Sequence, residues 1–81
     1  MKSNPKQTLA TLEELLGKLE ERPTHNDRIT LVKDRVHSLR DCLVGSMPAE
    51  YGLQLALAHE AGSALDEKDN DIKVLIKRLE A

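Results

Sequence analysis

His59 and Glu60 come closest in this sequence to a catalytic motif, because they begin like the His-Glu-x-x-His helix of a zinc protease. That helix needs a second histidine four residues after the first, so that both imidazoles bind the metal from one face. Ser63 stands at that position, and the second zinc ligand is absent. His25 and His37 are too scattered in the pattern to complete a site with His59. We therefore expect no zinc site.

Two further stretches carry ionisable or nucleophilic side chains without the partners that chemistry needs. The acidic run Asp66–Asp71 lacks the glycine and the closing bidentate glutamate of an EF-hand, so we interpret it as a solvated linker or helix cap. Cys42 is the single cysteine, and no histidine or aspartate stands at a predictable spacing to activate its thiol. The sequence also lacks a glycine-rich phosphate loop. We expect no catalytic, cofactor-binding or metal-binding residue and no enzymatic activity.

An amphipathic helix in the middle of the sequence organises the chain. Its apolar residues recur at spacings of three and four, which places them on one helix face: Ile29, Val32, Val36, Leu39 and Leu43. A seam this narrow is not stable alone in water. It needs partner helices, either from this chain or from another molecule.

Helix-starting and helix-stopping residues divide the rest of the chain. The starts are Asn4, Pro5, Thr24 and Pro48, and the stops are Pro23 and Gly45. We predict helices over about residues 5–21, 25–44, 48–65 and 70–80, with the acidic run as a break before the last. β-branched residues never alternate with polar ones, so we predict no strand. The predicted fold is one all-α domain, residues 1–81, a small antiparallel bundle of three main helices and a short C-terminal helix.

The predicted helix over residues 48–65 has a wider apolar surface than one antiparallel neighbour would cover. Either this helix is the central one of the bundle, or part of its surface binds a partner. Tyr51, the sole aromatic residue, is either an interface anchor or a lid on the end of the bundle with its hydroxyl in water. The candidate partner-binding residues are Tyr51, Leu53, Leu55, Leu57, Ala58 and Ala61.

A local excess of basic residues in the second predicted helix suggests an alternative function. Its candidate patch for an anionic partner is Arg28, Lys33, Arg35 and Arg40. We interpret this patch as a solvated face whose positive charge complements the acidic first helix or an acidic partner. The alternative is nucleic-acid binding or a regulatory role. The formal net charge of −2 argues against a general nucleic-acid binder.

Length and composition limit the number of domains, the size of the core and the location of the protein. Its 81 residues make at most one domain with a small core, to which a partner subunit would add stability. No apolar stretch is long enough to span a bilayer, and residues 1–7 lack the apolar core of a signal peptide. With one cysteine and no such segment, we expect a reducing, cytoplasmic location.

The connection Gly45–Tyr51 joins two amphipathic helices in a chain whose first helix carries the run Thr11–Leu15. Over most of its length the chain thereby resembles the small E-type co-chaperones of type III secretion needles, in which a helical hairpin with a Gly…Pro…Tyr connection precedes an alanine-rich helix. The resemblance implies pairing with a second, repeat-helical chaperone and shielding of the needle subunit from polymerisation in the cytoplasm. The C-terminal stripe Ile72–Leu79 departs from that family's pattern.

In the C-terminal part, the helix Asp34–Leu43 is followed by a proline-started helix, the pattern Ala64–Asp69 and a last amphipathic helix. This order is similar to the helical domain shared by the steroid receptor RNA activator protein and the outer-coat scaffold of secretory vesicles. Those domains usually end longer chains, whereas this sequence begins at Met1.

Both resemblances imply helices that bind helices. We expect a non-enzymatic protein–protein interaction module, an adaptor or co-chaperone. Its apolar helix face would be completed by another helical protein or by self-association.

Overall fold

The structure is a computed structural model that describes residues 5–22 and 26–79. Its helices are α1 (Pro5–Glu20), α2 (Asp27–Val44), α3 (Pro48–Ser63) and α4 (Asn70–Arg78), with a short 3₁₀ helix, η1 (Glu67–Asp69), before α4. The described residues contain no strand, and the helices pack against one another. The predicted all-α bundle of three long helices and a short fourth is therefore confirmed. No described helix combines the length and the apolar character needed to cross a bilayer.

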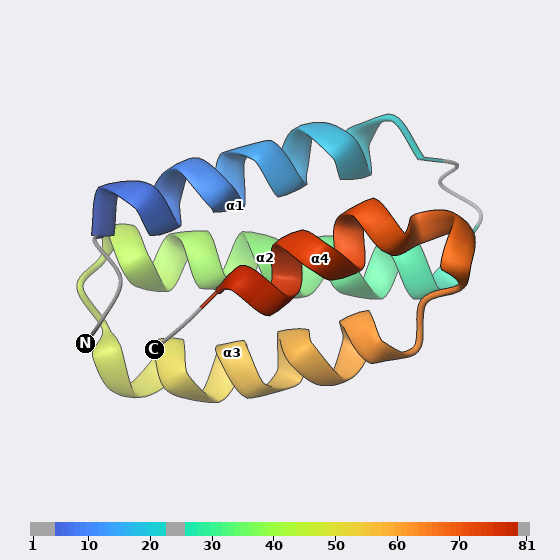
Figure 1. The fold of residues 1–81 in the computed structure, drawn as a ribbon. Helices are drawn as coiled ribbons and strands as arrows, with labels where there is room; N and C mark the ends of the chain where they lie inside the picture. The colour runs from blue at the N-terminus through green and yellow to red at the C-terminus, as the bar shows by residue number, and fades with distance from the viewer. Residues whose placement is uncertain (1–4, 23–25, 80–81) are drawn as a thin grey trace.

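The four helices run alternately in opposite directions along the bundle (Figure 1). α1 packs against α2, α2 packs against α3, and α4 contacts both α1 and α3. The radius of gyration is 11.7 Å, and a compact chain of this length is expected to have about 12 Å. The chain therefore closes a core with its own helices.

The start of α2 differs from the prediction. The predicted cap, Thr24, lies outside the described residues, and the helix begins at Asp27. Asn26 is the cap, because its side-chain oxygen accepts hydrogen bonds from the backbone N–H groups of Arg28 and Ile29, at 3.0 and 3.3 Å. These bonds satisfy two of the donors that a helix start leaves without intrahelical partners.

The other helix ends lie close to the predicted breaks. α1 and α3 begin at Pro5 and Pro48, whereas the predicted cap Asn4 lies outside the described residues. Gly45 follows the end of α2, but its φ of −81° is open to any residue. The left-handed conformation falls instead on Ser46, with a φ of 54°. The reversal between α2 and α3 therefore does not use the freedom of the glycine.

The acidic run after α3 breaks the helix, but it is not wholly solvated as expected. Five of its six residues are exposed, while Asp69 is buried at the start of α4. Arg22 Nε lies 3.2 Å from Asp69 Oδ1, an ion pair without the alignment of a hydrogen bond. A buried carboxylate needs such a partner, because an unpaired charge is costly to remove from water.

The core is aliphatic and draws on all four helices. From the seam of α2, four residues are buried and Leu43 is half-buried against them. Leu12, Leu15 and Leu19 enter from α1, and Tyr51, Ala58, Ala61 and Leu65 from α3 and the residues after it. Ile72, Leu75, Ile76 and Leu79 enter from α4 and its end. The partner helices that the seam needs thus come from this chain, and hiding the seam requires no second molecule.

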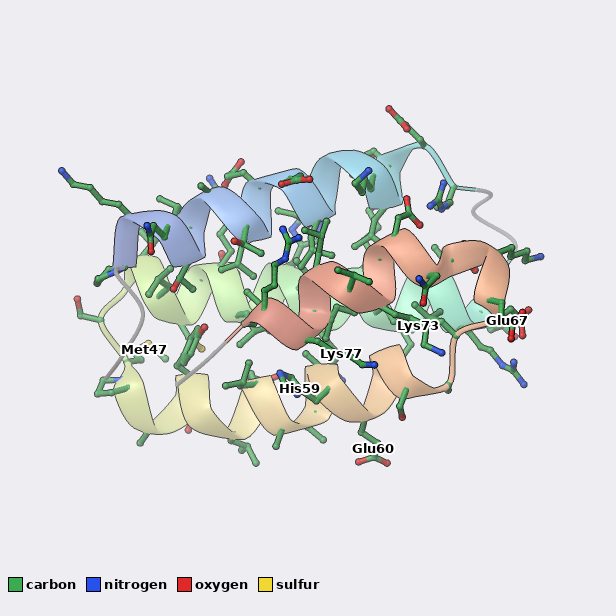
Figure 2. The ribbon with its side chains drawn as sticks, in the orientation of Figure 1. Met47, His59, Glu60, Glu67, Lys73 and Lys77 are labelled. Carbon is green, nitrogen blue, oxygen red and sulfur yellow. The ribbon has the colours of Figure 1, made fainter. Side chains whose placement is uncertain are left out.

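Polar contacts hold both ends of α4 against the rest of the bundle. At its start, Arg22 Nη2 at the end of α1 donates to both carboxylate oxygens of Asp71 at 2.7 Å, and Lys18 Nζ lies 3.6 Å from the same group. At its end, His59 Nε2 lies 3.2 Å from the carbonyl oxygen of Leu79. Charged and hydrogen-bonding groups from α1 and α3 thereby position α4 between them (Figure 2).

Gly62 lets α4 approach α3, because a Cβ at this position would lie 2.8 Å from Ile76 Cδ1 and 3.3 Å from its Cγ2. We expect Gly62→Ala to lower the free energy of unfolding by about 1–2 kcal/mol, since overpacking exceeds the gain in helix propensity. Urea unfolding followed by circular dichroism measures this change.

Gly17→Ala and Gly52→Ala are the matched controls, because no heavy atom lies within 4 Å of a Cβ at either position. Each should raise stability by about 0.5–1 kcal/mol. If Gly62→Ala were stabilising to the same extent, the close packing of α3 and α4 would be contradicted.

Asp71 links the stability of the α4 attachment to pH. Desolvation acts to raise the pKa of Asp71, but hydrogen bonds from Arg22 and the Ile72 backbone, with the charges of Arg22 and Lys18, lower it below 3.8 overall. Its ionised form is thus favoured in the fold. We expect Asp71→Asn to lose less than about 1 kcal/mol at neutral pH, since the pair is largely exposed. The loss should vanish as the pH falls through the native pKa of Asp71.

Asp34→Asn is the control for this titration, because Asp34 is exposed and forms no ion pair with a described residue. The prediction is checked by measuring the free energy of unfolding of the unmodified protein, Asp71→Asn and Asp34→Asn from pH 7 downward. A constant difference between Asp71→Asn and the unmodified protein at all pH values would contradict the assigned role of the charge.

Candidate protein-interaction surface

Three of the six predicted partner-binding residues belong to the core. Tyr51, Ala58 and Ala61 are 7%, 0% and 7% exposed. They are buried because α3 is flanked by α2 on one side and α4 on the other, so its wide apolar surface is largely covered within the chain. Their role as partner contacts stays a prediction, since Ala61 also lines a groove between α2 and α3, and Tyr51 lines one at the connection of these helices.

The other three predicted residues divide between two sides of α3. Leu55 is half-buried and packs against the core. Leu53 is 56% exposed, and Leu57, one turn further on, is half-buried. Residues four apart share a helix face, so Leu53 and Leu57 form one apolar stripe that the chain leaves partly uncovered.

Two stripes on α2 and α3 form a surface that we call the hairpin face. On α2 it consists of Asp27, Leu31, Asp34, Ser38 and Asp41, which recur at spacings of four and three. On α3 it consists of Ala49, Leu53, Ala56, Glu60 and Ser63, at the same spacings. All ten are exposed except the half-buried Ser38. By this periodicity the hairpin face turns away from α1 and α4.

A shallow groove of about 370 Å³ joins the two stripes. Leu31 and Arg35 line it from α2. From α3 and the residue that follows it, the lining consists of Leu57, Glu60, Ala61, Ser63 and Ala64. Leu31 is 45% exposed, and Glu60 points away from α4 (Figure 2). The groove therefore combines an apolar floor with one positive and one negative side chain at its edges.

Sequence reasoning missed Leu31 as an exposed apolar residue. The signal that would have found it is the second seven-residue pattern of α2, in which Leu31 stands between Asp27 and Asp34. A leucine among aspartates at helical spacing lies on a different face from the core seam. Such a residue is not needed to close the core.

The predicted basic patch does not form one free surface. Lys33 Nζ lies 2.9 Å from Glu20 Oε1, and Arg40 pairs with Glu13, so both side chains face α1. Arg28 lies 3.4 Å from Asp66 and donates to the carbonyl oxygen of Ala64 at 3.2 Å. Arg35 alone of the four has no ion pair among the described residues, and it lies in the groove.

A second, more apolar groove of about 480 Å³ lies at the connection between α2 and α3. Its lining consists of Pro5, Cys42, Leu43, Ser46, Met47, Pro48 and Tyr51. The Cys42 thiol is a free and buried one. Among residues 5–22 and 26–79, no three His, Cys, Asp or Glu side chains are placed to hold a metal ion. The connection groove thus offers apolar contact with few polar groups.

The burial of Tyr51 in this groove can be tested by titration. Desolvation raises the pKa of the Tyr51 hydroxyl above 10.0, so the fold favours the neutral phenol. The contribution of Tyr51 to the free energy of unfolding should therefore be fully present below pH 10 and be lost as the pH rises through its native pKa. Because Tyr51 is the only aromatic residue, tyrosinate absorbance reports on it alone.

We expect a native midpoint above 10 that returns to about 10 in denaturant. A native midpoint equal to the denatured one would show that the phenol is solvated and that its placement is wrong.

Comparisons of the chain with protein-family models, with curated proteins and with solved structures found no match. The two family resemblances drawn from the residues therefore stay predictions. What the chain does has to be inferred from its own surfaces.

Proposed function

We propose that this chain is a non-enzymatic protein–protein interaction module that binds another protein through its hairpin face. The observation that carries the proposal is the exposure of Leu31, which lines the α2–α3 groove, and of Leu53, one helical turn before the groove residue Leu57. The core is closed without them, so their burial by a partner would gain apolar contact that folding does not use. A patch of apolar anchors with polar edges is typical of such interfaces.

The finer form of the proposal is an adaptor or co-chaperone, of which a needle co-chaperone of type III secretion is one case. It is supported by the resemblance of the Gly45–Tyr51 connection and by the two packed helices, α2 and α3, on either side of it. Co-purification with a repeat-helical chaperone from a cell that makes both proteins would support this form.

Nucleic-acid binding through the basic patch receives less support. Three of its four cations pair with carboxylates of the same chain, and paired cations offer less attraction to phosphate. Salt-sensitive binding of DNA or RNA that is lost on reversing the charge of Arg35 would favour this alternative.

The proposed surface is tested by removing its apolar anchors without changing charge. The variant Leu31→Gln/Leu53→Gln should retain less than about one tenth of the partner captured from native cells by the unmodified chain, because central apolar anchors dominate interface energies. Its thermal unfolding should change little, since both side chains are about half exposed in the monomer.

Val74→Gln is the matched control. Val74 is an exposed apolar residue of α4, at 40%, on another side of the bundle. This variant should capture the partner as well as the unmodified chain does. Equal capture by all three proteins would rule out the hairpin face as the binding surface.

A further inference from the structure

The hairpin face carries unbalanced negative charge. Its four carboxylates are those of Asp27, Asp34, Asp41 and Glu60, and none of them forms an ion pair with a described residue. Arg35 in the groove is the one cation that lines it. The other cations of α2 do not offset this charge, because Lys33 and Arg40 are turned toward carboxylates of α1. Arg28, which donates to the groove residue Ala64, is paired with Asp66.

The shape of the face suits a helix. Two antiparallel helices of 18 and 16 residues lie side by side over about 24 Å, at 1.5 Å per residue, and the groove between them lies toward the end formed by residues 31–35 and 57–64. A third helix fits such a groove when its apolar residues recur at spacings of three and four. α4 already lies across α1 and α3 in this manner, with Ile72, Leu75 and Ile76 turned inward.

From the charge and the shape together we infer that the occupant of the hairpin face is a basic amphipathic helix of another protein. Its apolar seam lies along Leu31, Leu53 and Leu57, and its lysines or arginines face the aspartates of α2 and Glu60 of α3. This inference rests on the proposed function and names its partner class. A second copy bound face to face would bring like charges together, which is unfavourable. Nucleic acid is unfavourable for the same reason, because its phosphates would lie against carboxylates.

The test uses three synthetic helical peptides with one leucine seam and with lysine, glutamine or glutamate at every polar position. Titration of the full chain at low salt should show the lysine peptide binding at least about tenfold more tightly than the glutamate peptide. The double variant Asp34→Lys/Asp41→Lys should bind the lysine peptide about tenfold more weakly. Added salt should weaken binding to the unmodified chain, because exposed charges are screened.

The matched control is Glu14→Lys/Glu67→Lys, which changes the net charge equally. Both residues are exposed, lie on α1 and η1, and form no ion pair with a described residue. This control should bind the lysine peptide within about twofold of the unmodified chain. An equal loss in both double variants would mean attraction to net charge without a site and would overturn the inference.

The remaining outcomes separate the inference from the proposed function. If the glutamine or glutamate peptide binds as tightly as the lysine peptide and binding is lost in Leu31→Gln/Leu53→Gln, the partner is not basic but the face is correct. If Leu31→Gln/Leu53→Gln binds every peptide as well as the unmodified chain does, the proposed face itself is wrong. A dimer of the chain alone that this variant dissociates would replace the basic helix by a second copy.

Discussion

Burial of the α2 seam by the chain's own helices is the constraint on which the rest of the structure depends. With no phenylalanine or tryptophan and one tyrosine, the core has to be built from small aliphatic side chains. All four helices must therefore turn an apolar stripe inward to close it. The packing is tight where α3 meets α4, because the side chain of Ile76 leaves no room for a Cβ on Gly62. Leu31 and Leu53 lie outside this core on the hairpin face, so a partner that buried them would not disturb the packing of the helices.

The arrangement of charge follows from the same packing. α2 has carboxylates of α1 beside one flank, and its lysine and arginine there form ion pairs with them. The opposite flank faces solvent and carries aspartates at seven-residue intervals. One helix thus presents a neutralised side to its own chain and an acidic side to the outside. Individual exposed pairs stabilise a fold little, but their placement decides which sign of charge a partner meets.

The periodicity of apolar residues and the positions of proline and glycine were enough to predict the helices, their order and the break before α4. Local signals indicated Thr24 as the start of the second helix, whereas the helix begins after the cap Asn26. They could not pair Arg22 with Asp71, 49 residues away, or place Asp69 in a buried site beside it. These contacts depend on how whole helices lie against each other.

The candidate site was predictable only in part for the same reason. Spacing identified α3 as unusually apolar, and Leu53 and Leu57 lie on its partly open side. It could not tell that α2 and α4 would cover Tyr51, Ala58 and Ala61. Of the two sources left open for the partner helices of the α2 seam, the chain itself supplies them, whereas exposed apolar residues remain on the hairpin face.

The most direct test of the hairpin face as a binding surface is a map of amide chemical shifts in the isotope-labelled chain as the leucine–lysine helical peptide is added. The account predicts that the largest shifts fall on the outward stripes of α2 and α3, around Leu31, Ser38, Leu53 and Glu60. It also predicts small shifts in α1 and α4. Largest shifts around Met47 and Tyr51 at the connection groove, or across α1 and α4, would contradict it.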